Sequence, residues 1–308
     1  MADRALTPPT ARFGVVDALR GAALCGMVAY HVEWDLAALG WPVVNPTSSL
    51  AWTVLGDLVA ATFLTLSGVA LALARSKGAR AASRRLVRLA LAGVSVTGAS
   101  LWFAPNQPIL FGILQCLAVS DLIGLVALRW PAPVRLGAAA LAMLTPMLWR
   151  SPAFDGWPLA ALGLGIEPPP TLDFRPLLPW LAGVLVGTVV GEALLLRSSG
   201  GRERVGPSSL RWLGRNSLAV YILHQPMLYG ALLLIRLALG GPALDADPFT
   251  LQCRSDCAST GVAPRLCRVA CACTAERLAA ERTSAHHALS LTPHHLDAVA
   301  QACRAAGG

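Results

Sequence analysis

Charged side chains are scarce in this sequence. They make up 14% of the 308 residues, whereas about 25% is usual in soluble domains. Apolar residues of the set AVILMFWYC account for 55%, and the mean hydropathy is +0.57. A soluble enzyme of this size cannot bury so much apolar surface, and the high hydrophobicity also excludes a disordered chain. The composition therefore predicts a polytopic membrane protein.

Signatures of the common soluble enzymes are missing as well. The sequence has no Walker, G-x-G-x-x-G or G-x-S-x-G pattern in a suitable strand context. A cleavable signal peptide is not expected either, because the first apolar run carries Asp17 and Arg20. The net charge of +8 lies entirely in residues 1–240, since residues 241–308 are balanced. A bias of basic residues towards the cytoplasm explains that excess, so we expect no nucleic-acid partner.

Seven apolar runs are long enough to cross the ~30 Å hydrocarbon layer as helices. Fifteen Lys and Arg residues lie in the N-terminal tail, in the gaps after the second, fourth and sixth runs, and at the first three positions of the runs that follow those gaps, whereas the other gaps hold two. We therefore expect an all-α transmembrane bundle of about seven spans in the inner membrane, with the N-terminus cytoplasmic and the tail periplasmic. The bundle comprises residues 1–240 and a cysteine-rich helical tail comprises residues 241–308. The predicted spans are 13–32, 51–74, 86–103, 109–128, 134–149, 177–196 and 217–239.

The first run carries ionisable residues on one helix face. Arg20 and His31 are eleven residues apart, which in an α-helix is three turns plus about 20° and about 16 Å along the axis. Asp17 is close enough in sequence to pair with Arg20, and Asp35, four residues beyond His31, is placed to orient its imidazole. Ionisable groups inside a membrane usually mark a functional site. The alternative is an ion pair that anchors the helix beside an interfacial histidine.

A second polar group opens the last run. Ser217, Tyr221 and His224 follow one another at helical spacing along one stripe, and Gln225 comes next. His31 and His224 are the two histidines of residues 1–240. The stripe predicts a second part of a site, although a buried histidine of this kind also serves as a structural hydrogen-bonding group.

Five segments of the sequence resemble the bacterial relatives of the heparan-α-glucosaminide N-acetyltransferase catalytic domain. This family is similar to a wider group of integral-membrane acyltransferases marked by Arg-x10-His on the first span, which matches Arg20 and His31 here. A stretch H-x-x-W-[N/D] of the family matches His31, Trp34 and Asp35. The animal enzymes differ, because their histidine lies further along, after an inserted segment. The five segments are VDALRGAALCGMVAYHVEWDL (16–36), FLTLSGVALALAR (63–75), FGILQCLAV (111–119), DFRPLLPWLAGVLVG (173–187) and WLGRNSLAVYILHQPML (212–228).

The resemblance implies acyl transfer across the membrane. Acetyl-CoA or another acyl-CoA is expected as the cytoplasmic donor, and an amine or hydroxyl of a sugar or glycolipid as the acceptor on the outer side. Heparan itself is not an expected substrate. A neutral imidazole is suited to deprotonate the acceptor, so His31 is the expected general base, with Asp35 and Arg20 completing the catalytic set.

Further residues are expected to bind the two substrates. Arginines bind phosphates well, so four of them near the cytoplasmic mouth are candidates for CoA, although they equally serve to orient the protein. Asp173 is a candidate for the acceptor, with an N-cap of the sixth helix as the alternative. No metal is expected. The remaining candidates are Trp34, Tyr221, His224 and Gln225 for the acceptor and Arg84, Arg85, Arg88 and Arg215 for CoA.

Two other classes of protein fit the same residues. A transporter or flippase of a small anion or lipid-linked sugar would use buried Arg20 and His31 as substrate and proton sites. A non-catalytic membrane subunit is the third alternative. Transfer from labelled acetyl-CoA separates them, because a transporter leaves the thioester intact. A homodimer is one assembly that the sequence allows.

The tail holds six of the eight cysteines. Two C-x3-C pairs separated by nine residues suit two short antiparallel helices, and an outer location favours oxidation. On that geometry we expect Cys253–Cys271, Cys257–Cys267 and Cys273–Cys303, one of 15 connectivities. The alternative is a zinc site that also uses the tail histidines His286, His287, His294 and His295.

Overall fold

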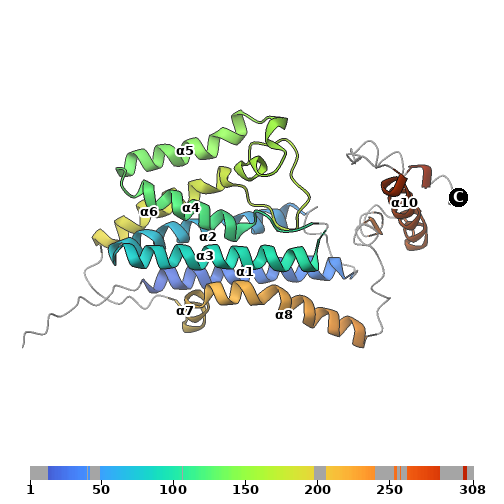
Figure 1. Cartoon of the computed structure of the whole chain (residues 1–308). Coiled ribbons are helices and arrows are strands. Elements are labelled where there is room, and N and C mark those ends of the chain that lie inside the picture. The colour runs from blue at the N-terminus through green and yellow to red at the C-terminus, as the bar shows by residue number, and fades with distance from the viewer. Residues whose placement is uncertain are drawn as a thin grey trace, which may run out of the picture. The chain divides into compact units, whose positions relative to one another are not determined.

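The computed structural model shows helices at all seven predicted apolar runs (Figure 1). Among the described residues, five helices are long and apolar enough to cross a membrane, namely α1 (Gly14–Ala38), α2 (Leu50–Ser76), α3 (Ala79–Phe103), α6 (Leu177–Arg197) and α8 (Ser217–Ala238). Two shorter apolar helices, α4 (Ile113–Ala127) and α5 (Ala132–Leu148), lie at the fourth and fifth runs. The predicted all-α membrane bundle is confirmed. The structure describes residues 13–39, 41, 49–105, 107–197, 206–239, 253–254, 257, 262–284 and 301–303.

The helix boundaries differ from the predicted runs in several places, and α1 extends six residues beyond its run to Ala38. Helix α3 begins at Ala79, seven residues before the predicted run, because alanine and arginine are strong helix formers. Arg84, Arg85 and Arg88 therefore lie on a helix and not in a loop. A short amphipathic helix, α7 (Ser208–Arg215), precedes α8 and was not predicted. The loop between α5 and α6 contains two 3-10 turns, η1 (Pro152–Phe154) and η2 (Leu159–Leu162).

The chain divides into two compact units. The first comprises residues 1–27 and 56–222, and the second comprises residues 28–55 and 223–308. In the first unit, α3 packs against α4, while α4 and α5 both pack against α6 (Figure 1). Leu64 of α2, Cys116 of α4 and Val184 of α6 are fully buried in its main core cluster.

Glycines bring α2 and α6 into direct backbone contact. A methyl group at Gly68 would overlap the carbonyl of Val184, and one at Gly187 would overlap the carbonyl of Thr65. Small residues of this kind allow membrane helices to approach closely, where van der Waals packing drives association. The short α7 is held similarly, because a methyl group at Gly214 would overlap the backbone of Asp17 on α1.

The outward faces of the helices are apolar. Soluble monomers rarely expose apolar patches larger than a few hundred Å², whereas a lipid-facing surface must be apolar. The exposed large side chains on the helices include Leu58 of α2, Leu91 and Val94 of α3, Leu141 and Met147 of α5, and Leu196 of α6.

Three disulfides join the described cysteines of the tail, which belongs to the second unit. They are the predicted pairs Cys253–Cys271, Cys257–Cys267 and Cys273–Cys303, with Cα–Cα distances of 5.7, 5.6 and 5.8 Å. Helix α10 (Pro264–Ser284) carries Cys267, Cys271 and Cys273. Oxidised sulfurs are not zinc ligands, so the structure favours disulfides over the metal alternative. The histidines of that alternative, His286, His287, His294 and His295, lie outside the described residues, and the domain boundary at residue 240 stays a prediction.

Candidate active site

The two predicted histidines come together in the second unit. His31 of α1 and His224 of α8 have ring centroids 4.9 Å apart, with the planes tilted by 60°. Tyr30 stands edge-on to His31 at 5.7 Å and also contacts Trp52 of α2 at 6.4 Å. The Nδ1 atom of His31 is buried and has no hydrogen-bond partner within the described part of the chain. An imidazole with a buried, unused nitrogen is able to exchange a proton with a bound molecule.

Asp35 and Gln225 form the polar pair beside these histidines. The Gln225 Nε2 atom donates to the Asp35 Oδ1 atom at 2.7 Å, and Asp35 is only 1% exposed. Asp35 was expected to orient His31, but within the described part of the chain its carboxylate accepts from Gln225. Trp34, which precedes Asp35 on α1, is half-buried.

Two oxygens of this pair are open for a ligand. Asp35 Oδ2 and Gln225 Oε1 are buried, and neither has a hydrogen-bond partner among the residues that the structure describes. A buried acceptor without a partner costs about 1–3 kcal/mol. An amine or a hydroxyl supplies the N–H or O–H that these oxygens lack. His31, His224, Asp35 and Gln225 therefore form a cluster that can hold such a group beside a base.

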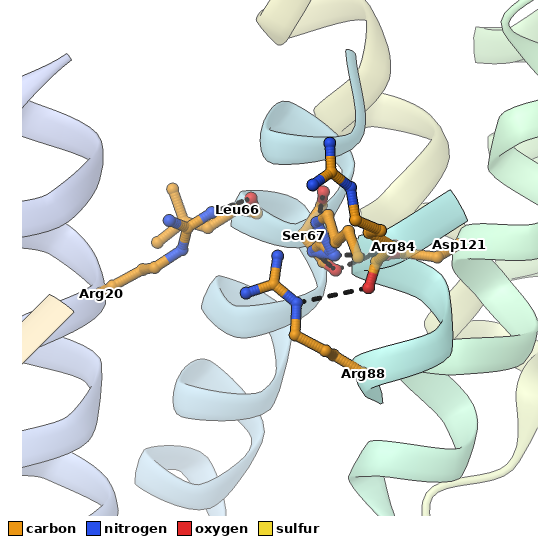
Figure 2. A network of polar contacts seen from close by, with 7 residues as sticks. Arg20, Leu66, Ser67, Arg84, Arg88 and Asp121 are labelled. Carbon is orange, nitrogen blue, oxygen red and sulfur yellow. Dashed lines mark hydrogen bonds and ion pairs between the residues drawn. The ribbon is translucent and has the colours of Figure 1, made fainter. Parts of the chain in front are cut away.

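Arg20 lies in the first unit and bonds to α2. Its Nη2 atom donates to the carbonyl of Leu66 at 3.0 Å (Figure 2). The predicted pairing with Asp17 is loose, because Arg20 Nη1 and Asp17 Oδ1 are 3.9 Å apart. A guanidinium has five N–H donors, so Arg20 keeps donors for a ligand beyond these two contacts.

Asp121 forms a buried network that the sequence analysis missed. Its Oδ2 atom accepts from Arg85 Nη1 at 2.7 Å, and its Oδ1 atom accepts from the Ser67 hydroxyl at 2.9 Å (Figure 2). Arg85 Nη2 also donates to Ser67 Oγ at 2.6 Å. A carboxylate inside an apolar run is a signal in itself, but its partners come from two other helices and are not readable from the run.

The four arginines predicted for CoA therefore differ in their surroundings. Arg85 is partly buried and bonds to Asp121 and Ser67, whereas Arg84, Arg88 and Arg215 are exposed. Arg84 and Arg88 each donate through Nε to a backbone carbonyl one turn earlier on α3, and Figure 2 shows the bond from Arg88 to Arg84. The exposed three are the better placed to meet the phosphates of a soluble ligand.

Asp173 caps a helix from a distant loop. Its Oδ2 atom accepts from the backbone N–H of Ile113 at 2.9 Å, so it caps α4 and not the sixth helix that the capping alternative named. Burial raises the pKa of the Asp173 carboxyl, while the Ile113 N–H and the charge of Arg175 act against that rise. Arg175 pairs with Asp57 at 2.7 Å and lies over the Trp180 ring.

Tyr221 is brought near this loop. It packs against the main core cluster, and the charges of Asp173 and Arg175 act on its hydroxyl. Asp173, Arg175 and Tyr221 thus belong to one group in the first unit. His224 and Gln225, which follow on the same helix α8, belong to the second unit.

The family model described as heparan-alpha-glucosaminide N-acetyltransferase, catalytic, matches residues 12–226. That range contains every candidate residue described above and ends before the first tail cysteine. Searches among curated proteins and among solved structures gave no match.

Proposed function

Because the chain belongs to the family of the heparan-alpha-glucosaminide N-acetyltransferase catalytic domain, a family of membrane acetyltransferases, we propose that it transfers an acetyl group from acetyl-CoA to a sugar or glycolipid. The accepting atom is an amine nitrogen or a hydroxyl oxygen. The donor is bound from the cytoplasmic side and the acceptor from the outer side of the membrane.

The observation that carries the proposal is the cluster around His31. A base with a buried, unused Nδ1 lies among groups whose open oxygens suit an amine or a hydroxyl. In the proposed step, His31 takes the proton of the acceptor while its nitrogen or oxygen attacks the thioester carbonyl. The bond from carbon to sulfur breaks, and the CoA thiolate leaves and receives the proton from His31.

Asp35 and Gln225 have a binding role in this proposal. Their open oxygens accept hydrogen bonds from the acceptor and so hold it in one orientation beside His31. Positioning of this kind lowers the activation barrier, because the reacting groups no longer have to find each other. His224 contacts the His31 ring and completes the wall of the cluster.

The donor is assigned to arginines. Exposed Arg84, Arg88 and Arg215 suit the phosphates of CoA, because guanidinium groups bind phosphate with two parallel hydrogen bonds. Arg20 is half-buried and has N–H groups without a partner among the described residues, so we assign it to the negative charge of the donor. The positive-inside rule supports a cytoplasmic position for these residues.

The orientation of the protein is part of the proposal. The three tail disulfides support a periplasmic tail, because disulfides persist outside the cytoplasm. With seven spans, a periplasmic tail implies a cytoplasmic N-terminus.

Purified protein in lipid nanodiscs tests the proposal directly. Labelled acetyl-CoA is offered with a panel of amino sugars, neutral sugars and glycolipids, and both label transfer and free CoA are measured. Transfer that needs an acceptor supports the proposal. Uptake of labelled substrate into vesicles with the thioester intact would favour the transporter instead.

A further inference from the structure

We propose that Asp121 is a positioning residue for Arg20. Through Arg85 and Ser67, it fixes the turn of α2 at Leu66–Ser67 to which Arg20 bonds. This inference rests on the proposed function, because Arg20 needs a fixed position only if it meets a substrate.

Asp121, Arg85 and Ser67 form a closed ring of hydrogen bonds. Asp121 contacts Arg85 at 2.7 Å and Ser67 at 2.9 Å, and Arg85 contacts the Ser67 hydroxyl at 2.6 Å. Asp121 and Ser67 are buried, with 0% and 4% of their surfaces exposed. Hydrogen bonds to charged groups are short and about twice as strong as neutral ones. The ring therefore holds Ser67 in one rotamer and ties α2 to α3 and α4.

Leu66, the residue next to Ser67, is the contact point of Arg20. The Arg20 guanidinium donates to its carbonyl at 3.0 Å, and Asp17 at 3.9 Å is too distant for a hydrogen bond (Figure 2). The Leu66 carbonyl is therefore the group that sets where the Arg20 guanidinium lies. Any shift of this turn of α2 moves Arg20 with it.

The same turn is supported from a third direction. Gly68 follows Ser67 and touches the backbone of α6 at Val184. Helix α2 is thus held at residues 66–68 by α1, by the pair of α3 and α4, and by α6. A turn with these contacts has little room to shift, which suits a role in positioning.

A second buried arginine offers a matched control. Arg135 of α5 pairs with Glu192 of α6 and donates to the Thr188 hydroxyl at 3.0 Å. This network also links two helices through a buried arginine, although its Glu192 partner is partly exposed, and none of its bonds involves Leu66 or Ser67. If both ion pairs serve only the folded state, loss of either one should lower the folded yield without acting specifically through Arg20.

A double-mutant cycle with Arg20 tests the proposal. Ser67→Ala removes one hydroxyl and keeps the pair of Arg85 and Asp121, so the protein should still fold. We expect Ser67→Ala to lower kcat/KM for acetyl-CoA roughly 10- to 100-fold, because a small misplacement of a group that meets the substrate lowers the rate by about this factor. In an Arg20→Lys background, Ser67→Ala should cost less than about twofold, because the precise contact is already lost. Glu192→Gln should have the same effect in both backgrounds.

A second readout does not depend on turnover. Affinity for a non-hydrolysable thioether analogue of acetyl-CoA is measured by calorimetry in the same four variants, and the same non-additivity is expected. The double variant Arg85→Met with Asp121→Leu should keep the folded yield of the wild type, since apolar pairs often replace buried ion pairs without loss of stability. Its kcat/KM should still be lowered.

The outcomes separate the two claims. If the wild type is active and Ser67→Ala is normal, the positioning role alone is overturned. The same holds if Ser67→Ala has equal effects in the wild-type and Arg20→Lys backgrounds. A wild type that neither transfers acetyl nor binds the thioether overturns the proposed function and the positioning role together.

Discussion

Two buried carboxylates in this protein differ in how many of their oxygens accept hydrogen bonds. Asp121 uses both oxygens of its carboxylate inside the protein, whereas in the described part of the chain Asp35 uses one and leaves the other open. Both are buried, so the difference does not come from exposure to solvent. A buried oxygen without a hydrogen-bond donor lowers the stability of the protein unless a ligand supplies one, so we interpret the open oxygen as part of a ligand site.

Replacement of His31 by alanine is expected to remove most of the acyl transfer. Loss of a general base lowers the rate by roughly 10²- to 10⁴-fold. Binding of the acetyl-CoA thioether should persist, because the donor is assigned to arginines elsewhere on the chain. Initial rates with labelled acetyl-CoA, with folded protein quantified by size-exclusion chromatography, give the comparison. A well-folded His31→Ala protein with near-normal turnover would contradict the central claim and turn attention to His224.

Replacement of Asp35 by asparagine should act on the acceptor alone. The change puts an amide where the open oxygen accepts a hydrogen bond, so KM for the acceptor should rise about tenfold or more, in line with the loss of one hydrogen bond to a charged group. KM for acetyl-CoA should stay within about twofold. Asp57→Asn is the matched control, because Asp57 is a carboxylate of a neighbouring helix that pairs with Arg175. Equal effects of the two variants on the acceptor KM would argue against an acceptor role for Asp35.

The residues on the first and last apolar runs were predictable, and the pairs between other runs were not. His31 and His224 stand out because histidine is rare in hydrocarbon, and the structure places their rings 4.9 Å apart. Asp121 and Glu192 also lie in apolar runs, but their partners Arg85 and Arg135 come from parts of the chain that sequence spacing does not relate. Asp173 shows the same limit, since its capping role was predictable but the capped helix was not.

Whole helices associate here through glycine as much as through large apolar side chains. The contact of α2 with α6 rests on Gly68 and Gly187, whose positions have no room for a methyl group. Sequence alone predicted both helices and not their contact, because a glycine in an apolar run shows no partner. Helix α7 was missed for a related reason, since eight amphipathic residues give too short a pattern.

Replacement of Gly187 by alanine is expected to destabilise the protein. The methyl group would overlap the carbonyl of Thr65, and overpacking typically costs about 1–3 kcal/mol. Gly98→Ala on α3 is the matched control, because a methyl group there meets no atom within 4 Å. Thermal unfolding of the detergent-solubilised protein should show a lower Tm for Gly187→Ala and an unchanged or higher Tm for Gly98→Ala. Equal Tm values would mean that α2 and α6 separate more easily than the structure implies.

The molecule as a whole joins a lipid-facing bundle to an oxidised tail. The seven predicted runs and the three disulfide pairs were predictable, because hydropathy and cysteine spacing are both local patterns. The division of the chain into its two compact units was not, since residues 28–55 join residues 223–308 across a long stretch of sequence.

Thiol labelling is expected to place the tail outside the cytoplasm. The background is Cys25→Ser with Cys116→Ala, which leaves the six tail cysteines. In spheroplasts, a membrane-impermeant maleimide should label the tail after reduction and not before it. A cysteine introduced at exposed Ser83, in the arginine-rich start of α3 that is expected to face the cytoplasm, should react only after lysis. Tail labelling that also requires lysis would reverse the orientation, and labelling without reduction would contradict the disulfides.

The backbone contact of α2 with α6 also constrains how the protein is made. Gly68 leaves the ribosome long before Gly187, so α2 enters the membrane while its glycine face has no partner. The contact of α2 with α6 therefore forms late in biogenesis, and a nascent chain that stops before residue 177 leaves the Gly68 face of α2 uncovered.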